Sequence, residues 1–135
     1  MARRNYYRGK YKIDKELLQL AQGYAHCYKR WLKEYNQLEE CIGAIRHNSG
    51  RKDGESKSQT EKLALRMAEL RSKMETVERA AFEADAELYP WILKAVTTWG
   101  VGYESLAMGS NPIPCGKDMY HHRRRKFYWI LAKRI

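Results

Sequence analysis

The chain has 135 residues, of which 44% are hydrophobic and 12% aromatic, and its formal net charge is +10 at pH 7. A chain of this length and composition is expected to form one small folded unit, which argues against disorder throughout. No apolar run approaches the ~20 residues that span a bilayer, no apolar segment of a secretory signal follows the basic start, and three cysteines without paired spacing are typical of reduced thiols. We therefore expect a cytoplasmic protein with no membrane span, no metal site and no cofactor.

The positive charge is concentrated at the two ends of the chain. Residues 1–12 carry five bases and no acid, and residues 112–135 carry seven bases and one acid, whereas residues 13–111 are balanced, with fourteen bases and fifteen acids. A phosphate polymer suits this layout better than an evenly basic surface would. The alternative is a charge excess that only keeps the protein soluble.

The first segment, residues 1–12, is predicted to be a basic N-terminal arm. It mixes arginines and lysines with tyrosines, and we expect Arg3, Arg4 and Arg8 to bind phosphates along a DNA backbone or in the minor groove. A disordered tail is the alternative.

The second segment, residues 13–89, contains two long stretches in which apolar residues alternate in steps of four and three. The first comprises Leu17, Ala21, Tyr24, Tyr28, Trp31, Tyr35, Leu38, Ile42 and Ile45, and the second Leu63, Met67, Leu70, Met74, Val77, Ala81, Ala84 and Leu88. Such seams are typical of helices that pack at a shallow angle. We predict one helix from near Asp14 to Asn48 and another from Ser58 or Thr60. The polar stretch over 48–58 would join them in a long antiparallel hairpin.

The third segment, residues 90–135, is predicted to contain three helices over 90–98, 103–108 and 115–133, separated by glycines and prolines. Two short helices before a long one have the order of a helix-turn-helix unit. The apolar face of the long helix should pack on the two short ones. That face comprises Met119, Phe127, Ile130 and Leu131, and its expected partners are Trp91, Ile92, Val96 and Leu106. Arg123 falls on the packed side, with its charged end reaching water.

In a helix-turn-helix unit, the first turns of the last helix enter the major groove. The residues expected to read bases are Lys117, Asp118, His121 and His122, and those expected to bind phosphates are Arg124, Arg125 and Lys126. The complete prediction is an all-α protein, in which a long antiparallel hairpin precedes a DNA-binding unit that recognises double-stranded DNA.

Short motifs in this third segment resemble the helix-turn-helix of region four of bacterial sigma factors. The matching residues are Gly102, Tyr103, Glu104, Leu106, Ala107, Ile113, Cys115 and Tyr120, followed by the arginine cluster. The segment is also similar to the C-terminal domains of small phage and prophage transcriptional regulators of the RinA and ArpU kind. This resemblance implies a phage-encoded regulator in the cytoplasm of a bacterial host. The chain departs from the pattern in its longer proline-containing turn and in His121 and His122, where the pattern has arginine.

Two further functions fit parts of the sequence. The hairpin could bind a host enzyme such as RNA polymerase or a defence nuclease. Alternatively, the chain could be a packaging protein similar to a small terminase subunit, which would require a ring-shaped homo-oligomer. We expect no catalytic residues, because the acidic pairs Glu39–Glu40 and Asp85–Glu87 lie beside bases on faces predicted to be exposed, and no phosphate-binding loop is present.

Overall fold

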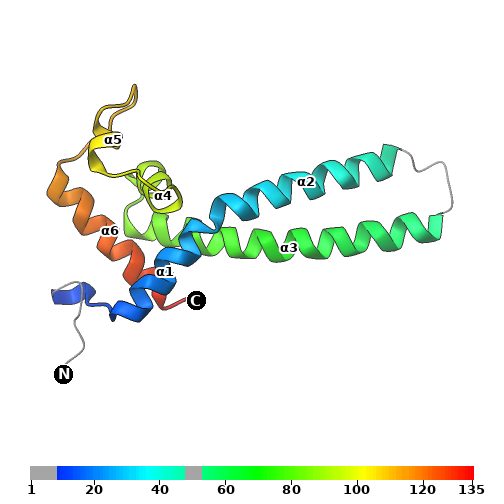
Figure 1. Cartoon of the computed structure of the whole chain (residues 1–135), viewed down its shortest axis with the longest axis horizontal. Helices are drawn as coiled ribbons and strands as arrows, with labels where there is room; N and C mark the ends of the chain where they lie inside the picture. Colours follow the sequence, from blue (N-terminus) through cyan, green and yellow to red (C-terminus); the bar gives the residue numbers. More distant parts are fainter. Residues whose placement is uncertain (1–8, 48–52) are drawn as a thin grey trace.

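The computed structural model describes residues 9–47 and 53–135, and these residues confirm the predicted all-α class (Figure 1). The helices are η1 (Gly9–Tyr11, a 3-10 helix), α1 (Lys15–His26), α2 (Tyr28–His47), α3 (Asp53–Ala84), α4 (Tyr89–Thr97), α5 (Tyr103–Ala107) and α6 (Lys117–Ala132). The arm residues that are expected to bind phosphate, Arg3, Arg4 and Arg8, lie outside the described residues.

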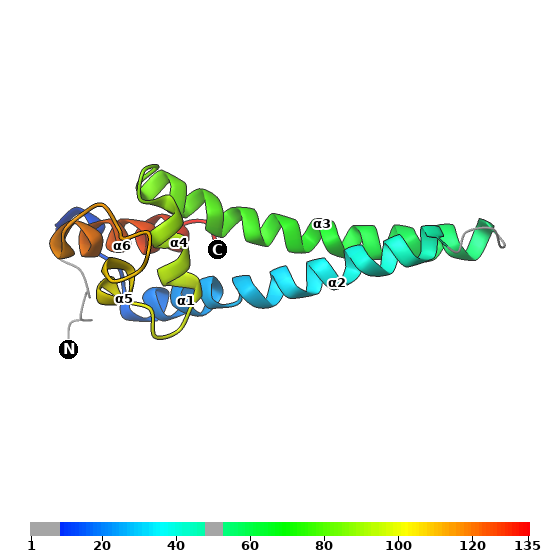
Figure 2. The ribbon, with the colours of Figure 1, turned by 90° about the horizontal axis from the view of Figure 1, so that it is seen from above.

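Helices α2 and α3 lie side by side in opposite directions and project as a hairpin from the rest of the molecule (Figures 1 and 2). Most of the predicted seam residues are buried or half-buried, among them Ile42 on α2 and Leu70 and Met74 on α3. Helix α3 begins at Asp53, inside the stretch predicted to be a loop. Lysine, glutamate and glutamine cost little in a helix, so the polarity of this stretch does not prevent it from being helical.

The single first helix expected from Asp14 to Asn48 is wrong, because the chain bends at Cys27 and forms α1 and α2. The Cys27 amide donates to the carbonyls of both Gly23 (3.2 Å) and Tyr24 (3.1 Å), which tightens the last turn of α1. Helix α1, which precedes the bend, packs on α6 and α4. Leu17, predicted to lie in the seam, is consequently 44% exposed, and its neighbour Leu18 is buried instead.

The bend has its cause in α6, which packs along the C-terminal half of α3 where the first helix was expected. From Ala80 to its end, the residues of α3 that are buried in the core are small, namely Ala80, Ala81 and Ala84. Small side chains let a neighbouring helix approach closely, and burial of α6 there leaves α1 to cover its other side.

We call the part of the molecule opposite the hairpin tip the head: it consists of α1, α4, α5, α6 and the end of α3 from Val77. The head has one continuous buried cluster, to which residues from both the second and the third predicted segments contribute. Its largest fully buried side chains include those of Tyr120, Phe127 and Tyr128, all on α6. Helix α6 therefore forms the centre of the head.

The inward face of α6 differs from the predicted one. Met119 is 48% exposed, whereas Tyr120 and Tyr128 are fully buried together with Phe127 and Leu131. The prediction placed α6 only against α4 and α5, but α3 and α1 pack on it as well. A helix with neighbouring helices on several sides buries more of its circumference than a single amphipathic stripe indicates.

The elements α4, α5 and α6 follow one another in the predicted order. Residues 108–116 connect α5 to α6, and this connection is held against α5 because the Ile113 amide donates to the Leu106 carbonyl at 3.0 Å. The Tyr103 hydroxyl donates to the Cys115 carbonyl at 2.9 Å, immediately before α6 begins. Both hydrogen bonds hold the second half of the connection against α5, which sets the position of the first turn of α6.

Candidate nucleic-acid interface

Two of the seven bases in the C-terminal cluster bind α6 to α3. Arg123 Nε lies 3.0 Å from Asp85 Oδ2, and Arg134 forms an ion pair with Glu83. The other carboxylate oxygen of Asp85 accepts hydrogen bonds from the amides of Glu87 (2.9 Å) and Leu88 (3.0 Å), which closes the turn after α3. Arg123 is on the packed side, as predicted, but its charged end pairs with Asp85 in the partly buried contact between the helices.

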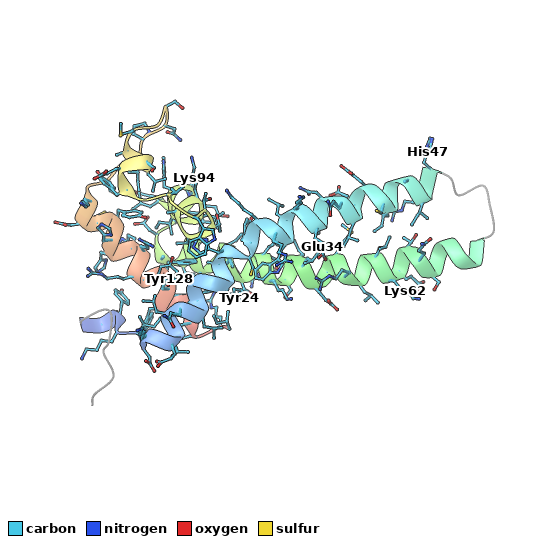
Figure 3. The ribbon with its side chains drawn as sticks, in the orientation of Figure 1. Tyr24, Glu34, His47, Lys62, Lys94 and Tyr128 are labelled. Carbon is cyan, nitrogen blue, oxygen red and sulfur yellow. The ribbon has the colours of Figure 1, made fainter. Side chains whose placement is uncertain are left out.

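Arg124, predicted to bind phosphate, lies on the inner side of α6 instead. Its Nε is buried and its Cζ lies 5.6 Å from the centre of the Tyr128 ring. Tyr120 and Tyr128 are one helical turn before and after it, on the same face. Burial raises the pKa of both tyrosine hydroxyls, and the nearby Arg124 charge opposes this shift. Figure 3 shows Tyr128 on α6 near α1, and the Arg124 charge acts on His26 of α1, so Arg124 lies on the side of α6 that faces α1.

The remaining bases are exposed or half-buried, and we call the surface that they form along α6 with their neighbours the outer face. It comprises Lys117, Asp118, Met119, His122, Arg125, Lys126, Trp129 and Lys133. Its members are exposed except Lys126 and Trp129, which are half-buried, and Asp118 is its one acid. The outer face therefore presents four bases to the surroundings, rather than the seven that the sequence cluster contains.

The four residues predicted to read bases are distributed unevenly at the start of α6. Lys117, Asp118 and His122 are exposed, whereas His121 is half-buried with its ring 5.1 Å from that of Tyr120. Burial, and then the positive charges of nearby bases, Arg124 foremost, lower the pKa of His121. The shift favours the neutral form of the imidazole, which has one donor nitrogen and one acceptor nitrogen.

Tyr11 of η1 lies against the middle of the outer face, which the sequence did not predict. Its ring contacts the rings of His122 (5.5 Å between centres) and Trp129 (5.3 Å) edge-on. Lys133 Nζ lies 3.3 Å from the centre of the Trp129 ring. The contacts of Tyr11 bring its exposed neighbours Lys10 and Lys12 close to α6. The 3-10 helix η1 and the middle of the outer face are thus in contact.

A second ring contact joins the ends of α1 and α4. The His26 ring stacks on that of Trp99 at 3.5 Å, with an angle of 9° between the planes. Burial lowers the pKa of His26, a hydrogen bond to the Thr97 backbone opposes the shift, and the Arg124 charge adds to it. The folded protein therefore favours neutral His26 more strongly than the unfolded chain does.

We expect this preference to make the fold less stable in mild acid. Because the pKa of His26 is lower in the folded state, the unfolded chain binds more protons below its ordinary pKa of 6.5, and stability is lost as the pH falls from there through the lowered value. Melting temperatures at about pH 7.5 and about pH 5.5 should differ less for His26→Gln than for the wild type. His47→Gln, at an exposed position at the hairpin tip, should behave like the wild type. Equal pH dependence in all three proteins would contradict the expected role of His26.

The described residues contain no group of three potential metal ligands and no helix that is both long and apolar enough to cross a membrane. None of the three cysteines forms a disulfide. No protein-family model matches the chain, and no curated protein or solved structure is significantly similar to it.

Proposed function

We propose that the protein binds duplex DNA sequence-specifically, as a transcriptional regulator encoded by a phage or prophage and acting in the cytoplasm of the bacterial host. The observation that carries this proposal is that some bases of the C-terminal cluster form ion pairs within the chain, whereas others do not. Ion pairs within the described part of the chain involve Arg123 of α6 and Arg134 just beyond it, but none involves Lys117, Lys126 or Lys133. These three lysines are therefore placed for a partner outside the chain.

In this proposal the outer face makes two kinds of contact. Lys117, Asp118 and His122 lie on the exposed first turns of α6, where base edges in the major groove would be within reach, and the half-buried His121 lies beside them. Arg125 and Lys126, in the following turn, bind phosphates and fix the position of the helix on the duplex. Lys10 and Lys12 extend this phosphate-binding surface, and Arg3, Arg4 and Arg8 of the N-terminal arm are expected to bind phosphates as well. The resemblance to sigma region four supports the same assignment, and no catalytic step or cofactor is required.

Selection of bound sites from a random pool of duplexes tests the proposal directly. We expect an enriched sequence motif, and affinity for random duplex that falls steeply with salt. With about four phosphates neutralised, the logarithm of the binding constant should fall with a slope of about −4 against the logarithm of salt concentration. Binding without an enriched motif would contradict sequence-specific recognition. An affinity that does not change with salt would contradict the phosphate contacts.

A further inference from the structure

The start of the described chain is held between α6 and the core of the head. Gly9 has a φ of 82°, a conformation that glycine adopts readily, and η1 begins at this residue. Two residues later the Tyr11 ring lies on α6, and Ile13, only 4% exposed, is buried in the cluster of the head. Helix η1 consequently lies beside α6 (Figure 1). Lys12 lies between the two held residues, and Lys10 directly precedes the first of them.

Tyr11 contacts two rings that are two helical turns apart on α6. The centres of the His122 and Trp129 rings lie 5.5 and 5.3 Å from that of Tyr11, and both contacts are edge-on. Arg125 and Lys126 occupy the turn between these two rings, so by helical spacing they lie to either side of the Tyr11 contact. The lysines next to Tyr11 are thereby brought close to the two residues that we expect to bind phosphates.

The cations around this contact lie on aromatic rings. Lys10 Nζ lies 5.8 Å from the centre of the Tyr11 ring, and Lys133 Nζ lies 3.3 Å from that of Trp129. The face of a ring attracts a cation and restricts where its side chain points, but the ring carries no net charge. Lys10 and Lys133 therefore keep their full positive charge while they are held on the surface.

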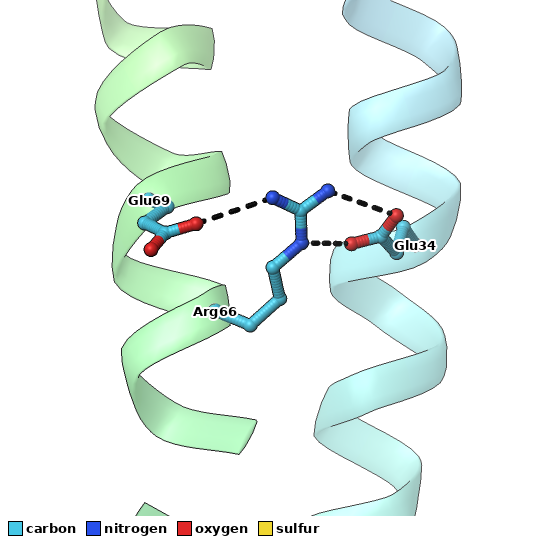
Figure 4. Close-up of polar contacts among 3 residues, drawn as sticks. All are labelled: Glu34, Arg66 and Glu69. Atoms are coloured by element: carbon cyan, nitrogen blue, oxygen red, sulfur yellow. Dashed lines mark hydrogen bonds and ion pairs between the residues drawn. The ribbon is translucent and has the colours of Figure 1, made fainter. Parts of the chain in front are cut away.

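The hairpin shows the opposite arrangement. Arg66 Nε lies 2.6 Å from Glu34 Oε2 across the hairpin, and Arg66 Nη1 lies 3.2 Å from Glu69 Oε2 (Figure 4). Two carboxylates there offset the charge of one guanidinium. Neither Lys10 nor Lys12 forms an ion pair in the described part of the chain. The charge beside Tyr11 is thus available to an anionic partner.

We propose that Tyr11 is a positioning residue for DNA binding, which holds Lys10 and Lys12 against α6 so that both lysines bind phosphates of the duplex contacted by this helix. The inference rests on the proposed function, because it takes the outer face of α6 as the DNA-binding surface. A lysine on a free chain end loses conformational freedom when it binds a phosphate, whereas a lysine that is already held loses less. Tyr11 therefore raises the affinity without contacting the DNA itself.

Proteolysis without DNA tests the positioning. Trypsin cleaves after lysine and acts on backbone that opens locally, so cleavage after Lys10 and Lys12 should be about tenfold faster in Tyr11→Ala than in the wild type. Tyr11→Phe keeps the ring and should be cleaved like the wild type. Synthetic peptides that span the two sites correct for the effect of each substitution on the protease. Equal corrected rates for the wild type and Tyr11→Ala would overturn the proposal, whether or not the protein binds DNA.

A double-mutant cycle tests the role in binding. Replacing Lys10 and Lys12 with glutamine removes two phosphate contacts, so the salt dependence should become shallower by about two in slope. In the chain with both lysines, Tyr11→Ala should lower the affinity for duplex about fivefold, because the lysines are then ordered only on binding. In the chain with both glutamines, the same substitution should change the affinity by less than about twofold.

Tyr35→Ala is the matched control for Tyr11→Ala. Both tyrosines are half-buried, and Tyr35 lies on α2, in the hairpin. The control removes the same side chain without touching the outer face, so it should leave both the affinity for duplex and the cleavage after Lys12 unchanged. Circular dichroism verifies that all variants stay helical.

The remaining outcomes separate this proposal from the proposed function. An equal loss of affinity for Tyr11→Ala in both backgrounds would overturn the proposal, because Tyr11 would then contact DNA itself or only support α6. A wild type that binds no duplex would overturn the proposed function and, with it, the role of Tyr11 in binding. The protease rates would still decide whether Tyr11 holds the two lysines on α6.

Discussion

Replacing both Arg125 and Lys126 with glutamate is expected to lower the affinity for duplex DNA about 100-fold or more at low salt. The two side chains lie on the outer face of α6, where the proposed function places phosphates. The double variant removes two cationic contacts and adds two repulsive ones, so the salt dependence should also become shallower, by about two in slope. Fluorescence anisotropy of a labelled duplex at several salt concentrations measures both quantities.

The matched control changes the same charge at another place. Lys29 and Lys33 are exposed on α2, away from the outer face, and their replacement with glutamate gives the same net charge as the first variant. Because screening weakens distant charges, we expect this control to lose less than about tenfold in affinity. Equal losses in the two variants would show that the total charge of the protein, and not the outer face, governs binding.

Phe127→Ala is expected to lower the free energy of unfolding by about 3–5 kcal/mol, the usual range for a buried phenylalanine. Phe127 is fully buried in the cluster that joins α6 to the rest of the head. The truncation leaves a cavity that close-packed neighbours cannot fill without moving. Urea unfolding followed by circular dichroism measures the change.

Met119→Ala provides the comparison, because both residues were assigned to one apolar face by their spacing. Met119 is 48% exposed, so its truncation should change the free energy of unfolding by only about 0.5 kcal/mol. A large loss for Met119→Ala together with a small one for Phe127→Ala would mean that α6 is rotated from the position described.

Local pattern was sufficient for much of the fold. The four-and-three spacing from Leu63 to Leu88 predicted a long helix with one buried side, and Pro90 predicted where the next helix begins. Both kinds of signal arise within a few turns of the chain, since helical periodicity and the steric effect of proline act on near neighbours. The hairpin and the order of α4, α5 and α6 follow from signals of this kind.

The bend at Cys27 could not be predicted in this way. The seam continues through Tyr24 and Tyr28 without interruption, and neither glycine nor proline stands at the bend. Its cause is competition for the surface of α3, which α6 occupies although it lies far away along the chain. A periodic pattern shows that a face is buried but not which partner buries it.

Some features of the candidate interface were likewise predicted from the sequence, whereas others depend on packing. The sequence by itself determined that a basic helix ends the chain, that a hairpin precedes it, and that the two ends carry the excess charge. The packing of distant elements determines three further features: Arg123 and Arg134 pair with Asp85 and Glu83, Arg124 turns inward between two tyrosines, and Tyr11 contacts the outer face of α6. The physical reason is that composition and spacing fix the residues a helix presents around its axis. The direction in which that helix faces depends on packing against elements distant in sequence.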